Sequence, residues 1–416
     1  MEYKRLEFED LKKEFEERLQ EMTDAKDKDE YLAAFKKLNV LRGHIYTMRT
    51  ISYIRHSINT ADEYYDKENE YWDNTMPLLE AYEVQLGKIL LNSPFRKEVD
   101  IPETLYKTFE NTLKSFDEKI IEDLQEENRL ATEYGKLKSS AKIEFDGEVY
   151  NLASIAPLMS DDDREVRRRA TIAYNKFFEE NEDKFDEIYD KLVKVRDRMA
   201  KKLGYENFTP LGYIRMNRLD YDQDMVRNYR DQVIADIVPL TVELRKKQAR
   251  RIGVDKLECY DLNYSFKSGN PKPHGTLDEL VEAALKMYTE MSPETGEFFK
   301  MMVDNEMFDL PTRPNKEMGG YCDGVFDYKM PFIFANSNGT ADDVDTLTHE
   351  AGHAFQAFCT FKNVDIPDLC FPTMESAEID SMSMEFFAHP YSEYFFKEDT
   401  QKYHYDHIAS SLIFLP

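Results

Sequence analysis

Two histidines, His349 and His353, stand four positions apart, and Glu350 follows the first of them. A helix with 3.6 residues per turn places residues four apart on one face, so both imidazoles can bind a single zinc ion. Glu350 can then accept a proton from a water molecule on that ion. With only 8 histidines in 416 residues, a chance match to this H-E-x-x-H pattern has a probability on the order of one per cent. The pattern is typical of zinc peptidases.

The residues around the histidines favour a helix. Thr340 and Asp343 stand at the spacing of a capping box, which predicts a helix that begins near Thr340. An apolar stripe follows at intervals of three and four residues, formed by Val344, Leu347, Ala351, Ala354, Phe355 and Phe358. We therefore expect this stripe to pack against the protein and the histidines to face a cleft.

A catalytic zinc site uses three protein ligands and leaves a fourth position open. One class of zinc peptidase has a glycine and a third histidine where this chain has Gln356 and Cys359, so that class is excluded. The segment 374–385 is predicted to form a second helix that returns beside the first. Four acids in it are candidates for the third ligand: Glu375, Glu378, Asp380 and Glu385.

Two acids are also candidates to support a ligand histidine through a hydrogen bond. Glu385 lies two turns beyond Glu378 on the same face, and Asp345 lies one turn before His349. The alternative for Asp345 is a favourable acid at a helix start. The alternative for the whole acidic segment is a solvated helix face.

Several stretches of the chain resemble the thimet oligopeptidase and oligoendopeptidase F family, and the bacterial oligoendopeptidase F branch most of all. They are residues 319–322, Asn336, 349–353, 378–385 and, less specifically, 160–164 and 203–205. In that family the third zinc ligand is the first glutamate of an E-x-x-S-x-x-x-E pattern. The resemblance therefore implies that Glu378 is the ligand, and that Ser381 and Glu385 fill the other fixed positions.

Apolar residues at helical spacing dominate the chain, which predicts a mainly α fold. Alternating residues around Asp146 and Gly147 predict a small hairpin at 143–150. The resemblance implies a two-lobed zinc peptidase with many helices and a small β-sheet beside the H-E-x-x-H helix. We expect the amino-terminal helical lobe at residues 1–195 and the catalytic region at residues 196–416.

Capping residues mark several helices before the zinc motif. A long helix is predicted from Asp222 to Arg251, where Gly253 would end it. Thr276 and Glu279 form a capping box. Ser292 before a proline predicts another helix start.

Aromatic and β-branched residues between positions 319 and 336 favour extended strands just before the zinc helix. We expect a sheet edge here, because the free backbone groups of an edge strand can bind an extended peptide whatever its side chains are. The candidate edge residues are Phe332, Ile333, Phe334, Ala335 and Asn336, and the alternative is an interior strand. The turn at Gly319, Gly320 and Tyr321 is similar to a family loop that can close over substrate, although glycines also simply permit a tight turn.

The sequence ends in an apolar run, residues 410–416, which predicts a fragment truncated at its C-terminus. Family members continue further and supply a loop with tyrosine and histidine that hydrogen-bonds the tetrahedral intermediate. Losing one such donor typically costs about 10² to 10³ in rate. The residues Tyr403, His404, Tyr405 and His407 are interpreted as helix-packing residues rather than as a replacement for that loop.

The composition excludes some partners. The chain has 82 acidic and 55 basic residues, and its formal charge of −27 would repel nucleic acid and anionic membrane surfaces. No apolar run approaches the roughly twenty residues of a membrane span. Four cysteines without C-x-x-C spacing are expected to be reduced thiols, which favours a cytoplasmic location.

These features together predict a zinc-dependent metalloendopeptidase with one Zn²⁺ per chain and Glu350 as general base, acting on short unstructured peptides. The alternatives are a catalytically impaired fragment and a helical peptide-binding protein with a structural zinc site. Structural zinc prefers closed, cysteine-rich sites, which favours the enzyme. Nothing in the sequence favours a particular cleavage preference or oligomeric state.

Overall fold

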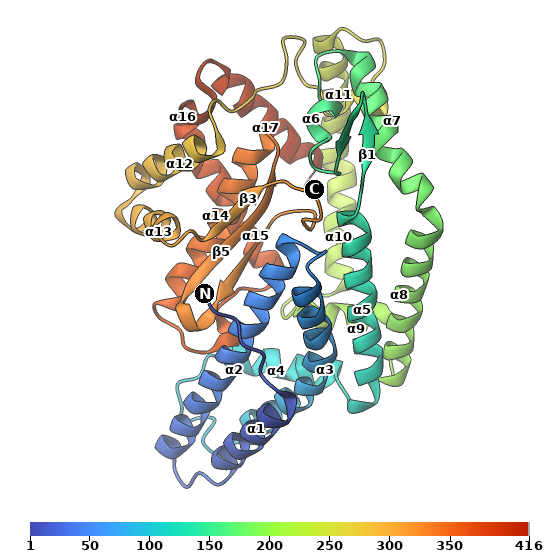
Figure 1. Cartoon of the computed structure of the whole chain (residues 1–416). Helices are drawn as coiled ribbons and strands as arrows, with labels where there is room; N and C mark the ends of the chain where they lie inside the picture. The colour runs from blue at the N-terminus through green and yellow to red at the C-terminus, as the bar shows by residue number, and fades with distance from the viewer. Residues whose placement is uncertain (415–416) are drawn as a thin grey trace.

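The structure, a computed structural model, describes residues 1–414 and consists mainly of helices (Figure 1). The amino-terminal helices are α1 (Phe8–Thr23), α2 (Lys28–Ile58), α3 (Glu63–Asn92), α4 (Glu103–Ser115) and α5 (Ile121–Ser139). Asp27 and Asp62 begin α2 and α3, because each side chain accepts hydrogen bonds from two backbone N–H groups of the first turn. The predicted mainly α fold is confirmed.

The predicted hairpin is present as β1 (Ile143–Phe145) and β2 (Glu148–Tyr150), which pair antiparallel. Asp146 and Gly147 form its turn with φ of 48° and 89°. Both values are positive, as the tight hairpin turns with this residue pair require.

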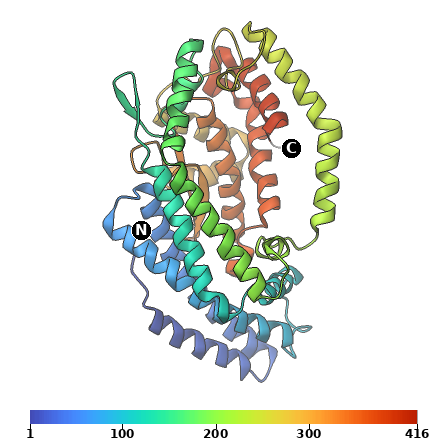
Figure 2. The same ribbon diagram turned by 90° about the vertical axis from the view of Figure 1, so that its right-hand side faces the viewer.

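The central part of the chain is a series of helices. They are α6 (Ala156–Met159), α7 (Arg164–Glu180), α8 (Glu182–Lys202), α9 (Phe208–Arg215), α10 (Gln223–Gln232) and α11 (Val238–Ile252). A π-helical turn, η2 (Val233–Ile237), joins α10 to α11, and Figure 2 shows the resulting long rod at the edge of the molecule. Gly253 ends this rod in a left-handed conformation, as predicted. The predicted domain boundary at residues 195/196 falls inside α8 and stays a prediction.

The last part of the chain combines helices with three strands. They are α12 (Leu277–Met291), α13 (Pro293–Asp304), β3 (Phe308–Pro311), β4 (Tyr321–Val325), β5 (Met330–Ser337), α14 (Asp342–Phe361), α15 (Met374–Ala388), α16 (Glu393–Phe396) and α17 (Thr400–Phe414). The capping box of Thr276 and Glu279 and the N-cap at Ser292 are confirmed. They fix the starts of α12 and α13.

The small sheet has the strand order β3-β5-β4, so β5 is its central strand. It runs parallel to β3 and antiparallel to β4, with Cys322 opposite Ile333. The prediction that residues 332–336 form a sheet edge is therefore wrong, and the alternative of an interior strand holds. Strands flank β5 on both sides, and its segment from Pro331 to Ala335 is buried. This explains the continuous apolar run.

One hydrophobic core joins the amino-terminal helices to the region around the sheet. It contains side chains of α1, α2 and α3 together with side chains of α12, α13, β5 and α14. The helix α14 packs against β4 and β5, and α2 also contacts β4. The helix that carries both histidines is thus held from several sides.

A buried arginine makes a second link between these parts. Arg42 of α2 is 1% exposed. Its guanidinium lies 2.7 Å and 2.8 Å from the two carboxylate oxygens of Asp368, in the turn η5 (Pro367–Leu369) between α14 and α15. It also contacts Glu83 of α3 at 2.7 Å. Removing one partner of such a buried pair leaves an uncompensated charge.

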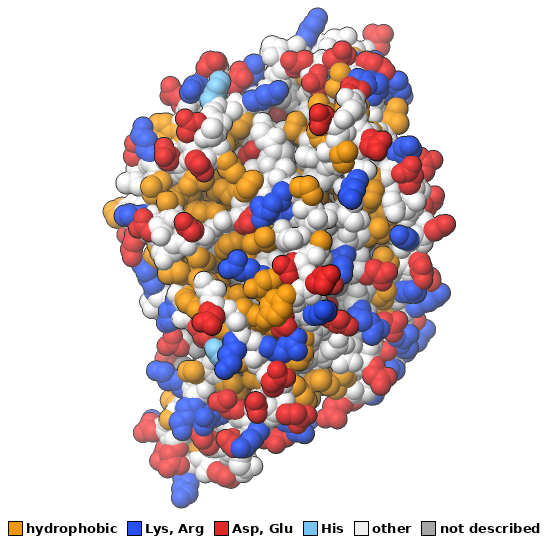
Figure 3. Space-filling view, in the orientation of Figure 1, with side chains coloured by type: hydrophobic (Ala, Val, Ile, Leu, Met, Phe, Trp, Pro, Cys, Tyr) orange, Lys and Arg blue, Asp and Glu red, His pale blue; other side chains and the backbone are white. Residues whose placement is uncertain are grey.

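The surface in Figure 3 carries acidic and basic side chains spread over the whole visible face. Among the helices of residues 1–414, none combines the length and the apolar character needed to cross a membrane.

Candidate metal centre

The two histidines of the motif lie one turn apart on the same face of α14. Their ring centroids are 5.0 Å apart and the rings are nearly perpendicular. The side chains of His349 and His353 are 28% and 18% exposed, so both remain open on one side. The two histidines therefore share one helix face, and the cleft that they are expected to face stays a prediction.

The start of α14 differs from the prediction. Its N-cap is Ala341, which has no side-chain cap, and not Thr340. The Thr340 hydroxyl donates instead to Asn338 Oδ1. Asp343 accepts the backbone N–H groups of Asn338 and Gly339 at 2.8 Å and 2.7 Å. The carboxylate therefore fixes the chain before the helix, a role that a spacing rule does not distinguish from a capping box.

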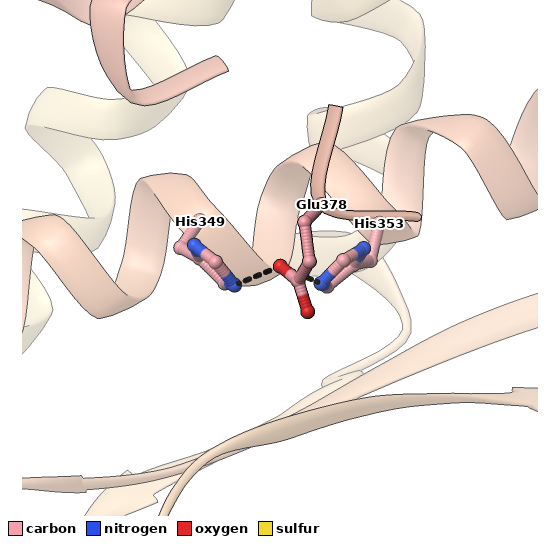
Figure 4. A group of neighbouring side chains, drawn as sticks. All are labelled: His349, His353 and Glu378. Atoms are coloured by element: carbon pink, nitrogen blue, oxygen red, sulfur yellow. Dashed lines mark ion pairs between the residues drawn. The ribbon is translucent and has the colours of Figure 1, made fainter. Parts of the chain in front are cut away.

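Glu378 of α15 meets the two histidines (Figure 4). Its Oε2 lies 3.2 Å from His349 Nε2 and 3.7 Å from His353 Nε2, and the three donor atoms all lie within 4.8 Å of one another. A tetrahedral zinc ion with bonds of 2.0–2.2 Å separates its ligands by about 3.4 Å. Two imidazole nitrogens and one carboxylate oxygen are also the donor types of a catalytic zinc site. The residues therefore fit zinc.

Close contact between α14 and α15 brings Glu378 within reach, and Gly352 permits that contact. A Cβ atom at this position would lie 2.6 Å from both the Asp380 backbone oxygen and Ser381 Cα. Real Cβ atoms essentially never approach other atoms so closely. The glycine inside the motif therefore sets the distance between the two helices.

We expect Gly352→Ala to weaken zinc binding at least tenfold, because the added methyl group forces α15 and its carboxylate away from the histidines. Zinc affinity measured by competition with a chelator tests this. Gly135→Ala in α5 is the matched control, since its new methyl group meets only the end of the Glu317 side chain. It should preserve zinc binding and gain some helix stability. Unchanged affinity in Gly352→Ala would contradict the close-packing argument.

Glu385 and Ser381 hold the candidate ligands in place. His349 Nδ1 lies 2.6 Å from Glu385 Oε1. A histidine that binds a metal through Nε2 carries its proton on Nδ1, which here donates to this carboxylate. Ser381 Oγ donates to Glu378 Oε2 at 2.8 Å. Burial alone would raise the pKa of Glu385, but hydrogen bonds from His349 and His407 lower it to about 2, so the carboxylate is ionised at neutral pH.

Asp345 was a candidate to support a ligand histidine through a hydrogen bond, but its carboxylate contacts a different residue. Its Oδ1 accepts a hydrogen bond of 2.6 Å from the Tyr403 hydroxyl in α17. Burial raises the pKa of Asp345 to about 7. This residue therefore connects α14 to α17, while Glu385 makes the contact with His349.

Glu350 is 6% exposed, and its Oε2 has no hydrogen-bond partner within residues 1–414. Burial raises the pKa of Glu350 to about 7; nearby His349 partly offsets this effect and Glu378 adds to it. A buried carboxylate oxygen without a partner is costly for folding and is typical of a functional site. This unpaired atom is a second observation that fits a metal-activated water.

The residues predicted to bind substrate fall into two groups. Four side chains of β5 are buried in the sheet, at Phe332, Ile333, Phe334 and Ala335. The others shape the loop before β4. Asn336 Nδ2 donates to the backbone oxygens of Glu317 and Gly319, at 2.8 Å each. The Tyr321 ring stacks on Phe334.

This loop lies beside Glu350. A Cβ atom at Gly320 would be 3.2 Å from Glu350 Oε1 and 3.3 Å from the Phe334 backbone oxygen. Gly319 has a φ of 101°, a conformation that favours glycine. The two glycines thus let the backbone pass close to the carboxylate of the motif.

Two family models and several known proteins match this chain. The model of the Peptidase M3 N-terminal domain matches residues 1–116, and the model of Peptidase family M3 matches residues 157–413. The chromosomal oligoendopeptidase F of Lactococcus lactis subsp. cremoris is 26% identical over 209 residues, which are 50% of this chain and 33% of that protein. The oligopeptidase PepF of Bacillus subtilis (strain 168) is 26% identical over 30% of this chain and 18% of its own length.

Solved structures match along the whole chain. A structure described as "PZ PEPTIDASE A with inhibitor 2" is 46% identical, with a TM-score of 0.99, and the match covers 100% of this chain and 74% of that one. A candidate oligoendopeptidase F from Bacillus anthracis str. Ames is 45% identical, with a TM-score of 0.98, and the match covers 100% of this chain and 76% of that one. The chain thus spans about three quarters of these solved proteins and matches a third of the first curated relative.

Proposed function

The chain belongs to peptidase family M3, and from this membership and the cluster of His349, His353 and Glu378 we propose that it is a zinc-dependent endopeptidase of short, unstructured peptides. One observation carries the proposal: three donor atoms of the catalytic zinc type converge within 4.8 Å, beside the unpaired buried carboxylate of Glu350. The names of its relatives, oligoendopeptidase and oligopeptidase, support short peptides as the substrate class.

In this mechanism His349, His353 and Glu378 would hold the zinc ion. The bound ion would supply a Lewis acid that polarises the scissile carbonyl and makes water more acidic. Glu350 accepts a proton from the attacking water, the new C–O bond forms, and Glu350 returns the proton to the amine as the C–N bond breaks. Glu385 keeps the proton of His349 on Nδ1, and Ser381 orients Glu378.

We propose β4, instead of β5, as the edge on which a peptide docks. Among the residues that the structure describes, β4 pairs only with β5, so its other side has no strand partner. An extended peptide can add to such an edge through backbone hydrogen bonds, without regard to its side chains. The strand directly follows Gly319 and Gly320, which brings a docked peptide next to Glu350.

A cleavage assay with a short quenched peptide and a folded protein tests the proposal. We expect cleavage of internal bonds of the peptide only, loss of cleavage after zinc removal with a chelator, and recovery when zinc is restored. Cleavage that survives zinc removal, or equal cleavage of the folded protein, would contradict it. Zinc-dependent peptide binding without any cleavage would favour a binding protein instead.

A further inference from the structure

We propose that His407 is a positioning residue for the candidate zinc ligand His349 and acts through Glu385. This inference rests on zinc binding under the proposed function and adds a residue from α17 to the site. It also corrects the interpretation of His407 as a helix-packing residue only.

Four side chains form a continuous chain of contacts. Glu385 Oε1 lies 2.6 Å from His349 Nδ1, and Glu385 Oε2 lies 2.6 Å from His407 Nε2. On its other side, His407 Nδ1 lies 2.8 Å from His389 Nε2 in the turn η6 (His389–Tyr391). The chain therefore connects α14, α15, η6 and α17. Glu385 and His407 are both more than nine-tenths buried.

The position of the proton on His407 follows from the hydrogen-bond acceptor that it faces. An ionised carboxylate only accepts hydrogen bonds, so His407 Nε2 must carry a proton toward Glu385. Neutral His407 then accepts from His389 through Nδ1, whereas charged His407 donates to His389. Both states keep the N–H on Nε2, so the contact with Glu385 does not depend on the charge of His407.

This contact has a consequence for His349. The two oxygens of Glu385 each accept an N–H, one from each ring, so the carboxylate cannot rotate without breaking a buried hydrogen bond. A fixed Oε1 in turn fixes the ring of His349, with Nε2 directed toward Glu378. Without the donor on His407, Glu385 Oε2 loses this buried partner, which is costly. The carboxylate then holds His349 less firmly.

Packing is the competing role, because the His407 ring also contacts aromatic neighbours. It lies 5.7 Å from the Tyr403 ring and 5.1 Å from the Phe386 ring, between centroids. Two substitutions separate the roles. His407→Phe keeps a ring of similar size and removes the N–H donor. His407→Gln loses the ring but places an amide N–H near the position of Nε2.

We expect His407→Phe to raise the zinc dissociation constant by about tenfold, the lower end of the usual effect of losing a partner behind a metal ligand, because His407 acts on His349 only through Glu385. His407→Gln should stay within about threefold of the unchanged protein. Chelator competition measures the affinities, and thermal melting of the metal-free proteins checks folding. Wild-type affinity in His407→Phe, or weaker binding only in His407→Gln, would overturn the proposal.

If His407→Phe does not fold, His407→Asn takes its place, since its amide is one methylene too short to reach Glu385. Weak zinc binding by His407→Asn beside normal binding by His407→Gln supports the positioning role, and equal binding by both overturns it. An unchanged protein that binds no zinc at all would contradict the proposed function itself, which is a different result.

Discussion

Glu350→Gln should retain zinc and lose peptide cleavage, with kcat/KM for a short peptide lower by about 10²- to 10⁴-fold, the typical contribution of a general acid–base residue. The amide has nearly the same size as the carboxylate but cannot accept the proton of the attacking water. Steady-state kinetics and zinc content of the same preparation test both parts. Near-normal turnover would contradict the role of Glu350 as base.

Folding provides an independent check on this variant. The pKa of Glu350 is raised from 4.5 to about 7, so the folded metal-free protein loses stability as the pH rises from about 4.5 to 7 and the carboxylate ionises. Glutamine has no such penalty. Above pH 7, metal-free Glu350→Gln should therefore be more stable than the unchanged protein by up to about 3 kcal/mol. Melting of both metal-free proteins at pH 5 and pH 8 measures this difference. A stability difference between Glu350→Gln and the unchanged protein that is the same at both pH values would contradict the penalty.

The matched control for this substitution is Glu297→Gln in α13. Glu297 is exposed and forms a surface ion pair with Lys362. Such pairs contribute little to stability. We expect both cleavage and melting to stay unchanged, which separates the effect of Glu350 from the general loss of one negative charge.

Glu378→Ala should remove most of the zinc affinity. If three protein ligands share a binding free energy of about 10 kcal/mol, the loss of one costs about 3 kcal/mol, or roughly 10²-fold in the dissociation constant. Chelator competition and metal analysis after dialysis measure this loss. A variant that retains its zinc would show that another group completes the site.

Glu375→Ala is the matched control for the third ligand, because the residue lies on the same helix and was an alternative candidate from the sequence. In the structure its Oε1 lies 2.9 Å from Arg218 Nε, so it forms an ion pair rather than facing the histidines. We expect normal zinc affinity. A loss equal to that in Glu378→Ala would point to a disturbed α15 rather than to a missing ligand.

The local parts of the site could be predicted from the sequence because they depend on helix periodicity. Four-residue spacing puts His349 and His353 on one face wherever the helix lies. The choice of Glu378 among four acids needed the family resemblance. Its distance from the histidines depends on how α14 and α15 pack, and no rule of spacing gives the close approach at Gly352.

Long-range contacts account for what the sequence did not predict. An apolar run such as residues 331–335 occurs in buried strands in general. Its place in the sheet depends on β3, a short strand that the sequence pattern did not indicate. His407 lies 22 residues beyond Glu385 in the chain. Only the fold of α17 back onto α15 brings their side chains together, so its histidine could not be distinguished from a packing residue.

The Arg42 contact has a mechanical consequence. Displacing its guanidinium from Asp368 and Glu83 leaves a buried charge without a partner. Losing one partner of a buried ion pair costs about 3–5 kcal/mol of stability. By comparison, exposed ion pairs elsewhere in the molecule break at little cost. The contact therefore resists separation of α2 and α3 from the turn that leads into α15.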